Sequence, residues 1–292
     1  MQTGTTLFRC LRAAALAACA AAAASGAALA AEIRVMTSGG FTAAYNELVP
    51  AFERATGHQV LTAYGASMGS AADSIPSRLA RGEPVDVVIL AAPALDSLLA
   101  QGRVAPGSRV DLVRSAIGLA VRAGAPRPDI RTVEALKRAL LDAGSIAYSA
   151  SASGVYYETE LVQRLGLAEQ LLPKSRRILS ERVGTVVARG DAELGLQQVS
   201  ELLPIQGIDY LGPLPAEVQR VTVFSAGVSA TSREPAAARE LIGFFTSAAA
   251  VPAIVRSGLE PARAQSVPAA VPAPGAPAPV PPAVPEPAGT TR

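Results

Sequence analysis

The sequence contains two cysteines, one histidine and no tryptophan, and each scarcity excludes a kind of site. Cys10 and Cys19 both lie in a leader that we expect to be removed, so the mature chain would have neither a disulfide nor a thiolate nucleophile. Because His58 is the only histidine, a zinc site built from cysteine and histidine ligands is excluded. Without tryptophan, and with few other aromatic residues, a sugar-stacking site is not expected.

An excess of one charge is also missing. The chain has 26 basic and 24 acidic residues, and Arg9 and Arg12 fall in the expected leader, which leaves 24 of each sign. A neutral body gives no electrostatic reason to expect nucleic acid as a partner.

The two ends of the chain have compositions unlike that of the body. Residues 1–30 read as an export signal: two arginines precede an alanine-rich run, and Ala28-Leu29-Ala30 offers a cleavage site. The run is shorter than the roughly 20 residues that span a bilayer. An alternative is a lipoprotein signal ending at Cys19. Residues 264–292 are mostly proline, alanine and valine, which predicts a disordered, extended tail.

Between these ends, apolar runs of strand length alternate with segments at helical spacing. Ile33–Met36 reads as a strand, and the helix that follows repeats large apolar residues every three or four positions until Gly57. Val85–Leu90 is apolar throughout, as a strand buried on both faces would be. The alternation predicts an α/β fold with a mostly parallel sheet, whose ligands bind at the carboxyl ends of the strands.

Three expected strand-to-helix turns consist of glycine and small hydroxyl residues: 37–40, 65–70 and 149–154. Unpaired N–H groups and the helix dipole favour an anion at such turns. The alternative is that these serines only cap helices, but three such turns in one chain favour binding. The candidate ligand-binding residues from the turns are Ser38, Gly39, Gly40, Ser67, Met68, Gly69, Ser153, Gly154 and the nearby Tyr156.

The second turn also spells G-x-S-x-G, the pattern of a serine hydrolase, from Gly65 to Gly69. That chemistry needs a histidine after the serine in chain order, and His58 precedes it. No Walker lysine follows any of the glycine turns, so nucleotide hydrolysis is not supported either.

An ordered set of segments resembles the type 2 periplasmic binding proteins, and among them the molybdate-binding group. The segments are 37–40, 52–57, 65–70, 81–87, 153–156 and 188–195. The resemblance implies a two-lobed fold with a ligand cleft between the lobes, lobe 1 comprising residues 31–113 and 222–263 and lobe 2 residues 114–221. It also implies a periplasmic monomer without a cofactor that captures a small anion, a molybdate-like oxyanion or an organic carboxylate, and delivers it to an ABC permease.

Two departures from the molybdate pattern leave a second function open. Gly40 stands where molybdate receptors usually have serine, and Gln198 stands where they usually have tyrosine, so Gln198 joins the candidate ligand-binding residues. Four stretches, 37–41, 67–70, 147–149 and 197–202, resemble the aconitate isomerase branch of this group, which moves a double bond within a tricarboxylate. Such an enzyme needs a base, for which Tyr148 and Glu201 are the first candidates.

Two further residues, Tyr156 and Glu158, are also candidates for the base by position. A tricarboxylate would need positive counter-charge, and the candidates for that are Arg78, Arg81, Arg122 and Arg182. Of the two functions, the sequence favours the receptor.

Overall fold

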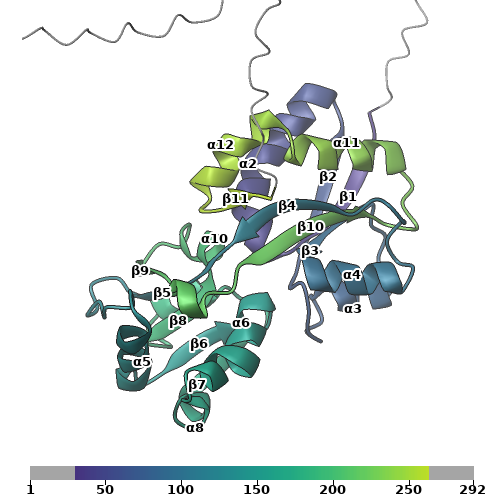
Figure 1. Ribbon diagram of the computed structural model, residues 1–292. Helices are drawn as coiled ribbons and strands as arrows, with labels where there is room; N and C mark the ends of the chain where they lie inside the picture. The colour runs from purple at the N-terminus through teal and green to yellow at the C-terminus, as the bar shows by residue number, and fades with distance from the viewer. Residues whose placement is uncertain (1–29, 263–292) are drawn as a thin grey trace, which may run out of the picture.

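The computed structural model describes residues 30–262, and these residues form two mixed β-sheets with helices packed against them (Figure 1). The expected leader and tail lie outside the described residues, apart from Ala30 at the end of the leader. We call each sheet with its helices a lobe.

The first lobe is built on a six-stranded sheet in the order β11-β4-β10-β3-β1-β2. Parallel pairing joins β1 to β2 and to β3, whereas β10 runs antiparallel to β3 and β4. The strands are β1 (Glu32–Thr37), β2 (Gln59–Tyr64), β3 (Val87–Ala91), β4 (Val110–Ser115), β10 (Thr222–Val228) and β11 (Glu260–Pro261).

The second lobe is built on a five-stranded sheet in the order β7-β6-β8-β5-β9. Here β6 pairs in parallel with β7 and β8, and β5 runs antiparallel to both of its neighbours. The strands are β5 (Ile117–Arg122), β6 (Ile146–Ser149), β7 (Ser175–Ile178), β8 (Leu194–Gln198) and β9 (Ile208–Pro213).

Helices follow most of the strands. The α-helices are α2 (Gly39–Thr56), α3 (Ile75–Ala80), α4 (Ala92–Ala100), α5 (Val133–Asp142), α6 (Ala152–Tyr156), α7 (Val162–Arg164), α8 (Ala168–Leu171), α9 (Val183–Ala188), α10 (Val199–Leu202), α11 (Pro235–Phe245) and α12 (Val251–Arg256). A π-helical turn, η1 (Tyr157–Leu161), joins α6 to α7, and three short 3₁₀ turns are η2 (Leu172–Lys174), η3 (Ala216–Val218) and η4 (Ala248–Ala250). No single helix within residues 30–262 is long and apolar enough to cross a membrane; the bent pair of α11 with η4 and α12 passes on length and composition together.

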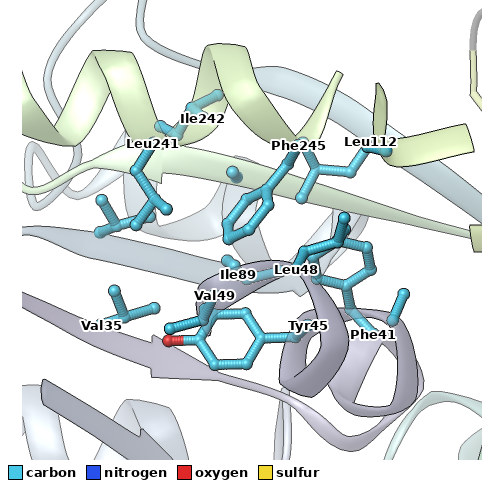
Figure 2. Close-up of a cluster of buried hydrophobic side chains, with 14 of the residues drawn as sticks. Val35, Phe41, Tyr45, Leu48, Val49, Ile89, Leu112, Leu241, Ile242 and Phe245 are labelled. Carbon is cyan, nitrogen blue, oxygen red and sulfur yellow. The ribbon is translucent and has the colours of Figure 1, made fainter. Parts of the chain in front are cut away.

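Helix α2 places its first turn at the site because its apolar stripe is locked into the core. Phe41, Tyr45 and Phe52 are almost fully buried, and Phe41 and Tyr45 pack against Phe245 of α11 at ring-centroid distances of 5.4 and 5.7 Å (Figure 2). Gly57 ends the helix with φ at +78°, a conformation that glycine adopts without strain. The predicted helix and its end are confirmed.

The chain changes lobes twice, and one side chain joins the two connections. Only Ala116 separates β4 from β5, and the return runs between β9 and β10. The amide nitrogen of Gln198 donates to the carbonyl of Ala116 (3.1 Å), while its oxygen accepts from Thr222 Oγ1 (2.9 Å). Gln198 therefore fastens both lobe connections to the end of β8.

The prediction of a mostly parallel sheet is wrong. Two sheets are present, and both are mixed, because the strands that follow a change of lobe, β5 and β10, enter antiparallel to their neighbours. Sequence patterns also missed β4, β9 and α10: β4 carries Asp111 and Arg114, β9 includes Gly212 and Pro213, and α10 has only four residues.

Candidate functional site

A cleft of about 370 Å³ opens between the lobes, next to the first turn of α2. Its first-lobe wall comes from α2, the end of β2 and the loop before α3, and its second-lobe wall from the loops after β6 and β7 and from β8 and α10. The lining residues are Gly39, Thr42, Asn46, Tyr64, Gly65, Ala66, Asp73, Ser149, Ala150, Ser151, Ile178, Leu179, Ser180, Glu181, Arg182, Gln197 and Glu201.

The lobes touch across this cleft. The backbone N–H of Ser67 donates to Ser151 Oγ at 3.3 Å, and Ser180 Oγ donates to Asp73 Oδ1 at 3.1 Å. Each bond joins a first-lobe loop to a second-lobe loop, so the two lobes are in contact beside the cleft. A solute held there would be bounded by both lobes.

Glu201 is the ionisable group with the most altered environment in the cleft. Burial raises the pKa of Glu201 to about 7, although Arg182 and a hydrogen bond from Gln197 both act in the opposite direction. The Gln197 amide donates to Glu201 Oε1 at 2.9 Å. A carboxyl group with such a pKa is present in both protonation states near neutral pH, as a general acid–base catalyst requires.

Glu201 lies directly against the first residue of α2. A Cβ atom added to Gly39 would stand 2.0 Å from Glu201 Oε1, so any larger residue there would displace the carboxylate from this position. Ser200 Oγ donates to the Gly40 carbonyl at 2.7 Å and fixes α10 against the same turn. The two glycines of this turn are therefore needed for close packing: a Cβ on Gly40 would meet the Phe224 ring at 2.1 Å.

The N-terminal turn of α2 also holds an unpartnered polar atom. Ser38 is the N-cap residue, yet its side chain makes no capping hydrogen bond. Within residues 30–262, Ser38 Oγ is the only buried side-chain nitrogen or oxygen without a hydrogen-bond partner. Such an atom costs about 1 to 3 kcal/mol unless something pairs with it, so a ligand bound at this turn would supply the missing partner.

The cleft is not basic. Arg182 is the only arginine among the lining residues, which also include Asp73, Glu181 and Glu201. Arg78 and Arg81 pair instead with Glu83, away from the cleft. Arg122 lines a separate cavity in the second lobe. The remaining polar groups of the cleft are mostly neutral hydroxyls and amides.

Of the ligand-binding candidates from the sequence, Gly39 lines the cleft, and Ser38 and Gly40 flank it in the same turn. Ser67 is fully buried, and its Oγ accepts from the N–H of Ala91 at 2.9 Å. Met68 and Gly69 line a second cavity, against α3 and α4. The middle turn therefore contacts the other lobe through the Ser67 N–H, and its Ser67 hydroxyl binds the end of β3.

The candidates from the third turn lie behind the cleft wall. Ser153 is buried and shares a hydrogen bond with Ser149, and the position of Gly154 leaves no room for a Cβ beside the Ser149 carbonyl. Tyr156 is buried and donates to the Val218 carbonyl at 2.6 Å. Gln198 joins the lobe connections, as described above.

The two proposed bases are separated by the fold. Glu201 lines the cleft, whereas Tyr148 packs on Tyr157 in the second-lobe core, with ring centroids 5.0 Å apart. Burial and the nearby Glu158 raise the pKa of Tyr148, which suits a structural phenol better than a base. Sequence reasoning missed Gln197, Asn46 and Ser180 as cleft residues, since neither helix turns nor charge patterns distinguish them.

Within the described part of the chain, no three His, Cys, Asp or Glu side chains are grouped as metal ligands. The cleft groups available for proton transfer and hydrogen bonding include Glu201, Gln197, Arg182 and the first turn of α2.

Comparisons with known proteins agree with the fold. Residues 33–260 match the family model described as bacterial extracellular solute-binding protein. An aconitate isomerase from Pseudomonas sp is 47% identical over 233 residues, covering 80% of this chain and 89% of the relative. The molybdate-binding protein ModA of Azotobacter vinelandii is 29% identical over 181 residues, covering 60% and 68% of the two chains.

Solved structures show the same fold at low identity. A periplasmic molybdate-binding protein from Azotobacter vinelandii superposes with a TM-score of 0.65 at 22% identity, covering 78% of this chain and 98% of that one. The sulfate-binding protein SubI of Mycobacterium tuberculosis superposes with a TM-score of 0.61 at 21% identity, covering 80% and 88%.

Proposed function

This chain belongs to the bacterial extracellular solute-binding protein family, and from that premise we propose that it is an aconitate isomerase acting in the periplasm. The observation that carries the proposal is Glu201, a carboxyl group with a pKa of about 7 that lines the cleft between the lobes. The 47% identity to an aconitate isomerase supports the same reaction.

The reaction needs one mobile proton and no redox partner. Aconitate has a CH₂ group next to a double bond, with a carboxylate on each of the three carbons. Glu201 takes a proton from the CH₂, and the electron pair of that C–H bond spreads over the three carbons and onto the terminal carboxylates. Protonated Glu201 then returns the proton to the other terminal carbon, so that the double bond moves by one position.

The geometry of the product depends on how the cleft holds the substrate. Rotation about the CH₂–carbon bond is free before proton removal, and the delocalised anion then fixes that bond. The cleft must therefore hold the terminal carboxylate in one orientation while Glu201 acts. We place one carboxylate at the α2 turn, where Ser38 Oγ lacks a partner, and another near Arg182, the cation of the cleft wall.

The decisive experiment mixes the purified protein, residues 31–292, with trans-aconitate in deuterated water. We expect cis-aconitate to form and deuterium to enter at the terminal carbons. Glu201→Gln should lose about 10²- to 10⁴-fold in kcat while still binding aconitate in a thermal-shift assay. Glu83→Gln is the control, because Glu83 pairs with Arg78 and Arg81 away from the cleft, and its activity should be unchanged.

A second candidate is a receptor for a small oxyanion, partnered with an ABC permease. The mostly neutral donors and the single arginine of the cleft favour it, as does the likeness to a molybdate-binding protein. Micromolar binding of molybdate or sulfate, with neither isomerisation nor deuterium uptake at high protein concentration, would replace the enzyme proposal with the receptor.

A further inference from the structure

Gln197 lies between two groups that fix its orientation. It is 3% exposed at the end of β8, and its Oε1 accepts from the backbone N–H of Val183, the first residue of α9, at 2.9 Å. A backbone N–H can only donate, so the amide oxygen must face Val183 and the amide nitrogen must face the other way. That nitrogen donates to Glu201 Oε1. The backbone thus determines which end of the amide meets the carboxyl group.

This arrangement treats the two oxygens of Glu201 differently. Oε1 lies between the Gln197 amide and Gly39. Within residues 30–262 nothing hydrogen-bonds to Oε2, and Oε2 is not among the buried atoms that lack a partner, so it is open to the cleft. Because an N–H is already directed at Oε1, a proton on Glu201 is placed on Oε2.

We infer that Gln197 is a positioning residue for the proposed isomerisation: it holds Glu201 Oε1 so that Oε2 is the oxygen that exchanges a proton with the substrate. The inference rests on the proposed function for its consequence, and on the Val183–Gln197–Glu201 chain of hydrogen bonds for its geometry. Gln197 itself transfers no proton, since an amide has no suitable acid or base group near neutral pH.

The other groups facing Glu201 do not perform this task. Arg182 acts on Glu201 as a charge, without a hydrogen bond to it. The remaining cleft acids have partners of their own, Asp73 with Ser180 and Glu181 with Arg189. Gly39 contributes space and no side chain.

Two variants test the role of the amide. Gln197→Met keeps the length of the side chain and removes both hydrogen bonds; Gln197→Glu keeps an acceptor for Val183 and removes the donor to Glu201. A hydrogen bond to the charged form favours that form, so in both variants Glu201 should titrate at higher pH, by about one pH unit in the methionine variant. The glutamate variant should shift further, because it adds a like charge.

The titration of Glu201 is followed by infrared spectroscopy. The band of its protonated carboxyl group is assigned as the one that is missing from the spectrum of Glu201→Gln. The matched control is Gln101→Met, an exposed glutamine whose amide contacts Ser97 on the surface of α4. If Glu201 titrates at the same pH in the folded Gln197→Met protein as in the unaltered protein, the inference is overturned. If Gln197→Met does not fold, Gln197→Glu decides by the same measurement.

The isomerisation assay adds a second readout. We expect kcat in Gln197→Met to fall by about 10- to 100-fold, with KM changed less, and the acidic limb of the kcat–pH profile to move up with the infrared titration. An unchanged kcat in a variant with a shifted titration would refute the positioning role. If the unaltered protein itself shows no isomerisation, the proposed function fails, and the infrared titration still decides whether Gln197 orients Glu201.

Discussion

Glu201 should make the stability of this protein depend on pH in a direction opposite to that of most carboxylates. Burial in the cleft wall raises its pKa from 4.5 to about 7. The folded protein therefore holds the Glu201 proton more tightly than the unfolded chain does. Between pH 4.5 and about pH 7, the folded protein binds more protons than the unfolded chain. Stability then falls as pH rises through that window.

The size of the effect follows from the shift. Each pKa unit corresponds to about 1.4 kcal/mol, so a shift of roughly 2.5 units gives about 3 kcal/mol. Above about pH 7 the unliganded protein should carry nearly all of this cost, and below about pH 4 none of it. Glu201→Gln removes the titrating group while keeping a similar shape. The difference in free energy of unfolding between the variant and the unaltered protein should therefore move in favour of the variant by about 3 kcal/mol as the pH rises from about 4 to about 8.

Urea unfolding of the two proteins at a series of pH values measures this gain, provided that no anionic ligand is present in the buffer. Glu83→Gln is a control of opposite sign, because hydrogen bonds from Arg81 and Arg78 lower the pKa of Glu83. That variant should lose stability, relative to the unaltered protein, as pH rises through the titration of Glu83. A difference between Glu201→Gln and the unaltered protein that stays constant with pH would show that Glu201 is not shielded in the cleft, and the argument for its catalytic role would fail.

Four further substitutions test ligand binding, isomerisation and stability. Ser38→Ala should weaken aconitate binding by about 10- to 100-fold in calorimetry, with little change in melting temperature. Ser67→Ala should lower the free energy of unfolding in urea by about 1 to 3 kcal/mol, because the Ala91 N–H loses its acceptor. If Ser38→Ala changed only stability and Ser67→Ala changed only binding, both assignments would be contradicted. Gly39→Ala should abolish most isomerisation by displacing the Glu201 carboxylate, and a fully active variant would refute that contact. Phe245→Ala should destabilise the first lobe by about 3 to 5 kcal/mol, and a loss below about 1 kcal/mol in urea unfolding would show that the ring is not a core element.

The sequence predicted the helices and central strands well because their patterns are local. In α2 the apolar spacing and Gly57 determine both the buried face and the end of the helix. The short elements behaved differently: α10 has four residues, and nothing in its local pattern distinguishes it from a turn. It forms because β8 delivers it to the first turn of α2, where Ser200 binds the Gly40 carbonyl. That contact joins distant parts of the chain, so the local pattern of apolar residues cannot predict it.

The same limit explains the candidate site. Ser38 and Ser67 both occupy turns that contain glycine and small hydroxyl residues, yet one hydroxyl lacks a partner and the other accepts a hydrogen bond from the Ala91 N–H. The difference lies in whether a distant N–H, that of Ala91, comes within reach. Glu201 was identified as a candidate base from its position in the sequence, but the environment that raises its pKa needs both lobes. Gln197 was missed because its role is visible only when Val183 and Glu201 are placed on either side of it.

The position of Glu201 also bears on why a binding fold would carry such a group. A carboxyl group beside the α2 N-terminus competes with an anionic ligand for the same positive end of the helix. For an oxyanion receptor this is a disadvantage, since repulsion from the ionised carboxylate would weaken binding above about pH 7. For an isomerase the same repulsion is useful. A substrate carboxylate bound at the turn raises the proton affinity of Glu201, and this strengthens the base at the moment when a C–H bond must be broken. Under the proposed function, Glu201 would therefore be a stronger base when the substrate carboxylate is in place.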